Sequence, residues 1–222
     1  MKTALVTGAS RGIGAAIARR LEKDGITVQR QDSSQADLST MEGVDRALEG
    51  IDSLDILVNN AAAQPAGPIE TDTPENFDRL MAVNVKAPYF LIQRAPLNDG
   101  GRVINVSSVA TRMANPAQTS FAMTKGALET MSRTLAHQLG PRGITVNVVA
   151  PGATRTADNG AIFTPELTTA IASLTAHQRL GTAEDIADVV AFLASDDARW
   201  VTGQVLDASG GLFLGPPGQG AE

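Results

Sequence analysis

The chain has 222 residues, of which 43% are hydrophobic and 19% charged, and its formal net charge is −6 at pH 7. This composition supplies a sizeable core and excludes a disordered chain, while the acidic balance argues against a sequence-independent grip on nucleic-acid phosphates. The absence of cysteine excludes disulfides, thiolate metal sites and cysteine nucleophiles, and it fits a reducing compartment.

The first residues lead straight into a strand pattern without a long apolar segment, which argues against a secretory signal. No apolar run approaches the roughly 18 residues that a membrane-spanning helix needs. We therefore expect a cytoplasmic protein with no nucleic-acid or membrane partner.

Short apolar runs that predict strands alternate with helical patterns along the chain. The predicted strands are residues 3–7, 26–29, 54–59, 102–106, 144–149 and 204–207. The predicted helices are residues 12–24, 41–50, 74–94, 118–139 and 183–195. Several strands are almost continuously apolar, as expected for strands covered on both faces, and the alternation requires crossover connections. The pattern predicts an α/β fold with a doubly wound, mostly parallel sheet and helices on both faces.

The connection after the second predicted strand is short. Only Ser-Ser-Gln-Ala separates Asp32 from Asp37, whereas a complete crossover with its helix takes at least about 10–12 residues. We infer that a helix and the strand after it are cut down here, so that the adenine side of any nucleotide site is shallower than usual. Nothing indicates a second domain, and we expect one domain over residues 1–214 and a flexible tail over 215–222.

A glycine-rich turn, Thr-Gly-Ala-Ser-Arg-Gly-Ile-Gly over residues 7–14, joins the first strand to the first helix. Glycines let the backbone turn tightly and approach a diphosphate, and the N–H groups at the helix start stabilise its negative charge. The alternative is a tight turn with small residues for packing. Its position between a strand and an Ala-rich helix favours nucleotide binding.

The spacing of these glycines and several later motifs, in the same order, resemble the short-chain dehydrogenase/reductase family. The motifs are Asn59-Asn60-Ala61-Ala62, Asn84, Val106-Ser107-Ser108, Pro151-Gly152 with Thr154 and Thr156, Arg179-Leu180-Gly181 and Val201-Thr202-Gly203-Gln204. The resemblance covers about residues 2–211. It implies a Rossmann-like fold, an NAD(P)-dependent oxidoreductase that interconverts a ketone and a secondary alcohol by hydride transfer, and a homotetramer, with a dimer as the fallback.

The resemblance also implies catalytic roles for Asn84, Ser108, Lys125 and the residue at position 121. In the family, the serine orients the carbonyl oxygen and a tyrosine exchanges a proton with it. The lysine lowers the tyrosine pKa and holds the ribose, and the asparagine supports a water. This chain departs from the family because it has Phe121 at the tyrosine position, thirteen residues after Ser108 as the family spacing requires.

The sequence leaves two explanations for the phenylalanine at position 121. In the first, which we favour, a parental tyrosine was replaced to stall catalysis, and the chain is an impaired enzyme. In the second, a natural protein without the tyrosine runs an atypical reduction or a non-redox step, or binds cofactor without catalysis. Tyr89, predicted on another helix, is a poor substitute acid, whereas His177 is a weak candidate.

The family motifs assign cofactor contacts, which we predict at Gly8, Ser10, Arg11, Ile13, Gly14, Asp32, Asp37, Leu38, Asn60, Ala61, Ala62, Lys125, Pro151, Gly152, Thr154 and Thr156. The cofactor is NAD(H) or NADP(H). Arg11 suits the 2′-phosphate of NADP(H), whereas Asp32 suits the ribose hydroxyls of NAD(H), and the sequence leans slightly to NAD(H). Two separated histidines without cysteine argue against a metal site. Residues 153–180 are expected to form a lid over a mainly apolar pocket for a small ketone or alcohol.

Overall fold

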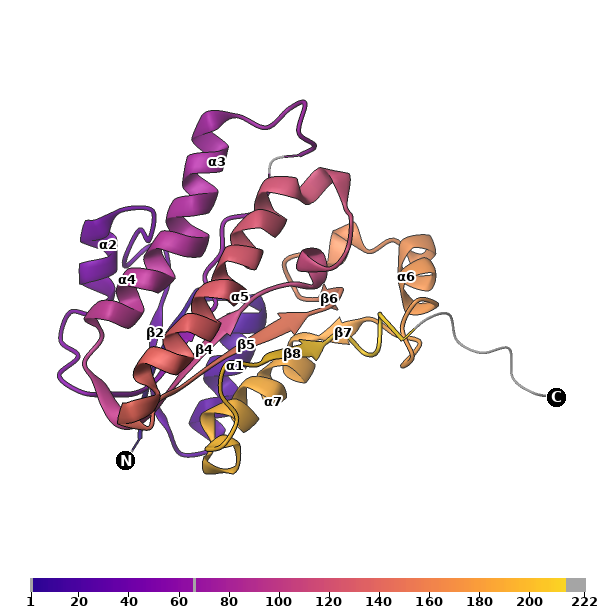
Figure 1. Ribbon diagram of the computed structural model, residues 1–222. Coiled ribbons are helices and arrows are strands. Elements are labelled where there is room, and N and C mark those ends of the chain that lie inside the picture. Colours follow the sequence, from indigo (N-terminus) through magenta and orange to yellow (C-terminus); the bar gives the residue numbers. More distant parts are fainter. Residues whose placement is uncertain (1, 66, 215–222) are drawn as a thin grey trace.

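A six-stranded sheet runs through the middle of the computed structural model, which describes residues 2–65 and 67–214 (Figure 1). The strands are β1 (Thr3–Thr7), β2 (Thr27–Gln31), β3 (Leu54–Asn59), β4 (Leu97–Val106), β5 (Thr145–Pro151) and β8 (Val205–Ala208). Their order is β2-β1-β3-β4-β5-β8, and every neighbouring pair is parallel. The predicted doubly wound fold is confirmed, while the predicted tail over 215–222 lies outside the described residues.

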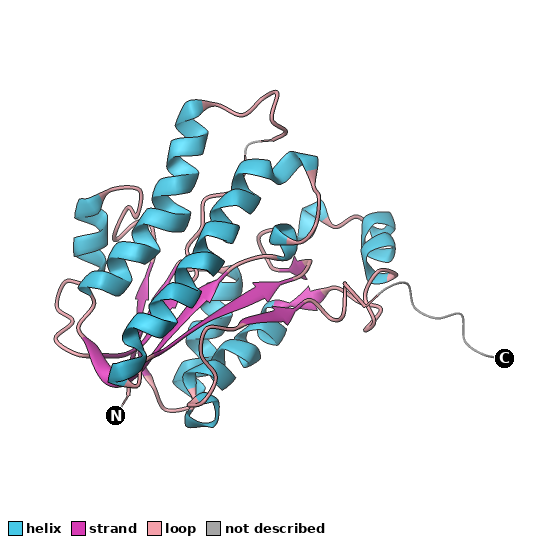
Figure 2. Cartoon of the chain, viewed as in Figure 1, coloured by secondary structure: helices cyan, strands magenta, loops and turns pink. Residues whose placement is uncertain are grey.

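Helices cover both faces of the sheet (Figure 2). α1 (Gly12–Lys23) and α7 (Ala183–Ala194) pack on one face, and α2 (Met41–Ala47), α4 (Ala87–Arg94) and α5 (Thr119–Leu139) pack on the other. Because side chains alternate along a strand, β1 feeds both cores: Ala4 and Val6 pack under α1 and α7, and Leu5 packs under the other helices.

Side-chain caps fix where several helices begin. The Thr40 hydroxyl accepts a hydrogen bond from Gly43 N at the start of α2, and Thr73 does the same for Asn76 N at the start of α3 (Pro74–Met81). At α7, Thr182 and Asp185 form a reciprocal capping box. These polar groups satisfy N–H groups that a helix start leaves unpaired.

The helix predicted over residues 74–94 is divided into three parts. α3 is followed by a π-helical turn over Ala82–Lys86 and then by α4. Proline lacks an N–H group, and its ring clashes with the carbonyl group four residues earlier, so Pro88 cannot continue an α-helical ladder onto Asn84. The wider turn accommodates this break.

Several predicted boundaries also require correction. The second strand occupies Thr27–Gln31, not 26–29, because pairing with β1 continues to the Thr7–Gln31 pair. The fourth strand begins at Leu97, not 102, since Leu54 already pairs with Leu97 before a shift in register. The last strand is displaced by one residue, to Val205–Ala208.

The connection after β2 is shortened, as predicted. In the described part of the chain β2 pairs with β1 alone, and it forms one border of the sheet. The loop that follows is held by its own side chains: Gln31 Nε2 donates to Ala36 O at 2.9 Å, and Ser34 N donates to Asp32 Oδ1 at 2.8 Å. These local hydrogen bonds take the place of the contacts that a full helix and strand would make.

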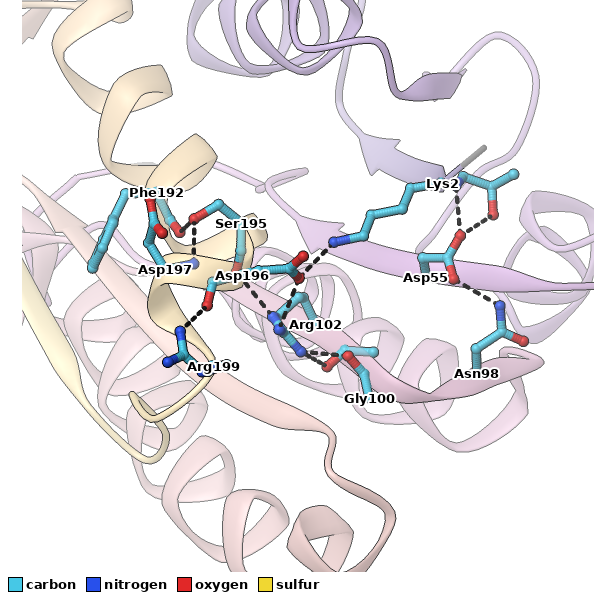
Figure 3. A network of polar contacts seen from close by, with 12 residues as sticks. Lys2, Asp55, Asn98, Gly100, Arg102, Phe192, Ser195, Asp196, Asp197 and Arg199 are labelled. Atoms are coloured by element: carbon cyan, nitrogen blue, oxygen red, sulfur yellow. Dashed lines mark hydrogen bonds and ion pairs between the residues drawn. The ribbon is translucent and has the colours of Figure 1, made fainter.

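A polar network joins β1, β3, β4 and the end of α7 at the amino ends of the strands (Figure 3). Asp55 accepts from Thr3 N at 2.7 Å and from Asn98 Nδ2 at 2.8 Å, and Lys2 Nζ lies 2.7 Å from Asp196 Oδ1. The network lies at the opposite end of the strands from the glycine turn and the predicted site motifs, so we assign it to the stability of the fold.

No helix in residues 2–65 or 67–214 combines the length and the apolar character that crossing a membrane requires.

We predict that Gly43→Ala lowers the free energy of unfolding by about 1–3 kcal/mol. An added Cβ would lie 1.9 Å from the backbone oxygen of Asp37, and no side-chain rotation relieves this contact because the backbone of residue 43 fixes the position of the Cβ. Gly140→Ala is the matched control, because its backbone is helical and nothing lies within 4 Å of the added atom. Urea unfolding of the three proteins checks this, and equal losses for both variants would contradict it.

Candidate active site

The glycine turn between β1 and α1 is packed so closely that side chains are excluded. A Cβ on Gly14 would lie 2.1 Å from Gly8 O, and Gly8 and Gly12 adopt φ values of 65° and 55°. No side chain caps the N-terminus of α1, and its first turn carries no acidic residue. Arg11, at the N-cap, and Ser10 are exposed. The start of α1 therefore presents its positive end to an anion without competition from the helix's own side chains.

Asn60 and Thr7 hold this turn against the end of β3. Asn60 Nδ2 donates to Thr7 O at 3.0 Å and to Gly8 O at 3.1 Å. In return, the Thr7 hydroxyl accepts from the backbone N–H groups of Asn60 and Ala61 at 3.0 and 3.1 Å. The turn and the Asn60–Ala62 segment are thus one rigid unit at the point where the strand order reverses, where ligands bind in open α/β sheets. The sequence did not single out the Thr7 side chain.

The segment over residues 153–180, in which a lid is predicted, lies against the glycine turn. It contains β6 (Thr154–Arg155) and α6 (Pro165–Ala172), and β6 pairs with β7 (Gly181–Thr182), which directly follows the segment. A Cβ built on Gly12 would lie 3.6 Å from Thr156 Cγ2 and 3.7 Å from Asp158 Oδ2. The predicted nicotinamide-side threonines and the predicted phosphate turn are therefore neighbours.

Two residues of this segment that sequence reasoning did not assign to the site organise this contact. Asp158 Oδ2 lies 3.5 Å from Arg11 Nε, which ties the segment to the glycine turn. Asn159 Oδ1 accepts from Thr156 N at 2.7 Å, and its Nδ2 donates to Thr154 O at 2.9 Å. An Asp-Asn pair followed by glycine is a turn signal, but nothing in it shows that the turn faces Arg11.

Asp32 and Asp37 lie on the loop after β2. Asp32 Oδ1 accepts from both the backbone N and the hydroxyl of Ser34, and these hydrogen bonds lower the pKa of its carboxyl group. The pKa of Asp37 is lowered mainly by its hydrogen bond from Ser39 N. Both are therefore carboxylates at neutral pH, available to accept from hydroxyl groups. Arg30, two residues before Asp32 on β2, does not offset this charge, because it forms a bidentate ion pair with Glu22 of α1.

The residues predicted from the catalytic motif meet where β4 ends against α5. Lys125 Nζ donates to Val106 O at 2.8 Å and lies 5.5 Å from the centre of the Phe121 ring. Ser108 follows β4 and its hydroxyl accepts from Ala110 N at 3.1 Å, while Ala110 packs against Phe121. The spacing of four residues puts Phe121 and Lys125 on one face of α5.

Asn84 lies in the π-helical turn and is buried beside this cluster. Its Oδ1 accepts from Ala63 N at 2.8 Å, and its Nδ2 donates to Ala63 O at 3.1 Å and to Thr124 Oγ1 at 3.1 Å. The Thr124 hydroxyl in turn donates to Phe121 O at 2.7 Å. Asn84 thus links the segment after β3 to the helix that carries Phe121 and Lys125.

Phe121 is a packed aromatic residue. It is 7% exposed and lies in an apolar cluster with Ala63, Leu80 and Ala110. Tyr89 is 44% exposed and contacts the edge of the Phe90 ring, so it is no substitute for the absent phenol. His177 is exposed between α6 and β7, where it lines a cavity of about 160 Å³ with Gly152 and Ser209.

The end of β5 brings the remaining predicted residues to the same edge of the sheet. Pro151 is the last residue of β5, and Gly152 N donates to Ala208 O at 3.2 Å. A Cβ on Gly152 would lie 2.8 Å from Ser209 Cα, so the glycine is required by this close approach. Within residues 2–65 and 67–214, no group of three His, Asp or Glu side chains is placed to hold a metal ion.

Comparisons with known proteins agree with this geometry. A family model described as short chain dehydrogenase matches residues 2–42, and one described as Enoyl-(Acyl carrier protein) reductase matches residues 34–213. An uncharacterized oxidoreductase of Methylorubrum extorquens is 41% identical over 95% of this chain and 97% of its own length. The chain belongs to the short-chain dehydrogenase/reductase family.

Other members of the family resemble the chain over almost its whole length. The 3-oxoacyl-(acyl-carrier-protein) reductase FabG of Haemophilus influenzae is 37% identical over 96% of this chain and 98% of its own. The crystal structure of the angucycline C-6 ketoreductase LanV with bound NADP has a TM-score of 0.86 and 45% identity, covering 96% of both chains. A short-chain dehydrogenase of Burkholderia cenocepacia in complex with NADP has a TM-score of 0.84 and 37% identity, covering 95% of this chain and 97% of that one.

Lys125 is the most perturbed ionisable group of this short-chain dehydrogenase/reductase site. Its side chain is 3% exposed, and burial lowers its pKa from 10.5 to about 8. Loss of hydration disfavours the ammonium form, and desolvation is the one cause that accounts for the shift.

We predict that Lys125→Met raises the free energy of unfolding at pH 7 by up to about 3 kcal/mol. A lysine whose folded pKa is about 8 and whose unfolded value is 10.5 binds fewer protons in the folded state between these values. The stability of the unsubstituted protein therefore rises with pH across that window, and the gain from methionine shrinks. Urea unfolding at pH 7 and pH 10 measures both effects.

Lys86→Met is the control for this measurement, since Lys86 is exposed. It should leave the slope of stability against pH unchanged. A gain from Lys125→Met that is the same at both pH values would contradict the buried-ammonium interpretation.

Proposed function

We propose that this protein is a reductase that uses a nicotinamide dinucleotide to interconvert a ketone and a secondary alcohol. One observation carries the proposal: the glycine turn after β1 and the Ser108–Phe121–Lys125 cluster after β4 lie on the same edge of the sheet. The segment from Thr154 to Asp158 leads from the end of β5 to the glycine turn. A dinucleotide lying along this edge reaches from one feature to the other.

The names of the relatives support this chemistry. FabG is a 3-oxoacyl reductase, and LanV is a C-6 ketoreductase that was crystallised with NADP. Another crystal structure of LanV contains NADP and rabelomycin, with 45% identity and a TM-score of 0.83. We propose a substrate of the same broad class, a ketone on a small organic molecule.

The residues present fit a dinucleotide. The close contact of Gly14 with Gly8 leaves backbone in place of side chains at the start of α1, as a bound diphosphate requires. We propose that the diphosphate is held by Gly8, Ser10, Arg11, Ile13 and Gly14, the adenine and its ribose by Asp32, Asp37, Leu38, Asn60, Ala61 and Ala62, the nicotinamide side by Pro151, Gly152, Thr154 and Thr156, and its ribose by Lys125. When bound in reduced form, the nicotinamide supplies a hydride.

The protein's own groups then orient the ketone. The Ser108 hydroxyl already accepts from Ala110 N, which leaves its proton free to donate to the carbonyl oxygen. Lys125 supplies positive charge beside it, and this charge stabilises the negative charge that develops on the oxygen. Asn84 positions α5 through Thr124. Phe121 contributes packing and no proton, so we propose that this chain turns over more slowly than a form with tyrosine.

We propose NADP(H) as the preferred cofactor, since the comparisons do not support the lean to NAD(H). Arg11 is exposed, and its ion pair is the 3.5 Å contact with Asp158, so its guanidinium can turn to a 2′-phosphate. Asp32 is already satisfied in part by Ser34, which weakens its demand for a ribose hydroxyl.

We predict that Arg11→Ala weakens NADPH binding about tenfold and NADH binding much less, because only NADPH carries the additional phosphate. Titration of cofactor fluorescence for each dinucleotide measures this. Arg133→Ala is the control, since Arg133 is exposed on α5. Equal losses for both cofactors would contradict the assignment of Arg11.

We predict that Phe121→Tyr raises the rate of ketone reduction on the order of 10²-fold, because it restores a positioned general acid. Reduction of ethyl acetoacetate and of α-tetralone with NADPH, followed by absorbance, is the measurement. Phe192→Tyr, an exposed phenylalanine on α7, is the control and should leave the rate unchanged. The absence of a phenol at position 121 favours a second candidate function, a cofactor-binding module without catalysis. Cofactor binding without reduction in either form would support this second candidate.

The lid over 153–180, the single domain over 1–214, the homotetramer and the cytoplasmic location stay predictions. Within the lid, Arg155 Nη2 donates to Thr168 Oγ1 at 2.7 Å, so this arginine organises the lid itself. Ile162 and Leu174 are exposed and give the lid apolar surface for a substrate.

A further inference from the structure

A carboxylate lies against the part of the glycine turn that is proposed to hold the phosphates of a dinucleotide. Asp158 Oδ2 is 3.5 Å from Arg11 Nε, and a Cβ built on Gly12 would lie 3.7 Å from the same oxygen. Gly12 is the first residue of α1, where the N–H groups of the first turn have no acceptor within the helix. The carboxylate therefore lies beside both positive features of the glycine turn.

Asp158 supplies the negative charge beside Arg11 in the part of the chain that the structure describes. Within residues 2–65 and 67–214, no other carboxylate pairs with Arg11, and no other cation pairs with Asp158. The first turn of α1 contains no acidic residue of its own. Asp32 and Asp37, which are assigned to the adenine side, accept hydrogen bonds within their own loop. The charge that faces Arg11 thus comes from a segment that is distant in sequence.

The backbone holds Asp158 in this position. Asn159 Oδ1 accepts from Thr156 N at 2.7 Å, and Asn159 Nδ2 donates to Thr154 O at 2.9 Å, so these hydrogen bonds close the turn that carries Asp158. The ion pair itself is loose, because 3.5 Å exceeds the usual N–H···O distance and the side chains of Arg11 and Asp158 are 77% and 39% exposed. The turn is fixed, whereas the partner of Arg11 can be exchanged.

A phosphate group competes with this carboxylate. A guanidinium binds a phosphate through two parallel N–H···O hydrogen bonds, and such a pair is stronger than one long contact with a carboxylate. A phosphate at the start of α1 also repels the Asp158 carboxylate, because like charges this close raise the energy of the complex. Asp158 therefore opposes a bound dinucleotide in two ways: it occupies Arg11, and it places negative charge beside the diphosphate.

We propose that Asp158 is a specificity-determining residue that competes with the cofactor from within the protein. Its carboxylate neutralises Arg11 in the cofactor-free protein and turns to solvent when the phosphates of a dinucleotide bind. This inference rests on the proposed binding of a nicotinamide dinucleotide at this edge of the sheet. Both cofactors carry the diphosphate, but only NADPH carries the additional phosphate that takes the Arg11 guanidinium. Asp158 thus limits the preference for NADPH that Arg11 creates.

The test is a double-mutant cycle in cofactor affinity. Asp158→Asn removes the charge and keeps the shape of the side chain, and Arg11→Ala removes the guanidinium. The Kd values of NADPH and NADH are measured by cofactor fluorescence for the unsubstituted protein, both single variants and the double variant. An exposed ion pair changes an equilibrium constant about two- to fivefold. We therefore expect Asp158→Asn to tighten NADPH binding by up to about fivefold and NADH binding by less than about twofold.

In the Arg11→Ala background there is no guanidinium to compete for. Asp158→Asn should then tighten NADPH and NADH binding by the same small factor, which reports the repulsion of the diphosphate alone. Calorimetric titration with 2′,5′-ADP gives a second readout that involves no nicotinamide and no reduction. Its affinity should rise in Asp158→Asn together with that of NADPH. Asp158→Ala, which also removes the charge, should reproduce the result without the amide group.

Asp52→Asn is the matched control, since it changes the net charge by the same amount. Asp52 is exposed just before β3, at the opposite edge of the sheet from the glycine turn. The substitution should leave the Kd of each dinucleotide unchanged. A gain in NADPH affinity as large as that of Asp158→Asn would show that overall charge, and not the contact with Arg11, sets the affinity.

The outcomes separate this inference from the proposed function. Unchanged or weaker binding of NADPH or 2′,5′-ADP in Asp158→Asn would overturn Asp158 as a competitor, and so would an equal gain for NADPH and NADH while Arg11 is present. In these cases the proposed function would stand if Phe121→Tyr reduces ethyl acetoacetate with NADPH. Failure of every form to bind either dinucleotide would overturn both the inference and the proposed function.

Discussion

Parallel pairing of all six strands is the constraint on which the site depends. In a parallel sheet every strand ends at the same edge. This edge carries the glycine turn after β1, Asn60 after β3, Ser108 after β4 and Gly152 after β5. The helices on both faces bury the strands and leave this edge open to ligands. The common direction of the strands thus brings residues from distant parts of the sequence to one place.

Much of this arrangement follows from the sequence. The alternation of apolar runs with helical patterns predicts the sheet, and the four residues between Asp32 and Asp37 predict the missing helix and strand. Phe121 and Lys125 are four residues apart on one helix, and this spacing alone places them on the same helix face. Family resemblance supplied the roles, and periodicity alone would have yielded a nucleotide-binding fold with no assigned chemistry.

Other features depend on contacts that no local pattern encodes. The π-helical turn arises from Pro88 together with the buried amide of Asn84, whose partners lie 21 and 40 residues away along the chain. The Arg11–Asp158 ion pair joins two exposed residues, and the local sequence around each of them fits a side chain that contacts only solvent equally well. The same holds for Arg30, because its partner Glu22 lies on α1 and the alternation of side chains along β2 gives no information about that helix.

Because the sheet ends at β2, it offers few contacts to the adenine end of a dinucleotide. With a five-residue border strand and a loop that bonds mostly to itself, little protein remains to sandwich an adenine ring. A base that stays partly hydrated contributes less apolar burial to affinity. The charged diphosphate end then carries a larger share of the attraction, and ionic strength governs cofactor retention more strongly than in a wider sheet.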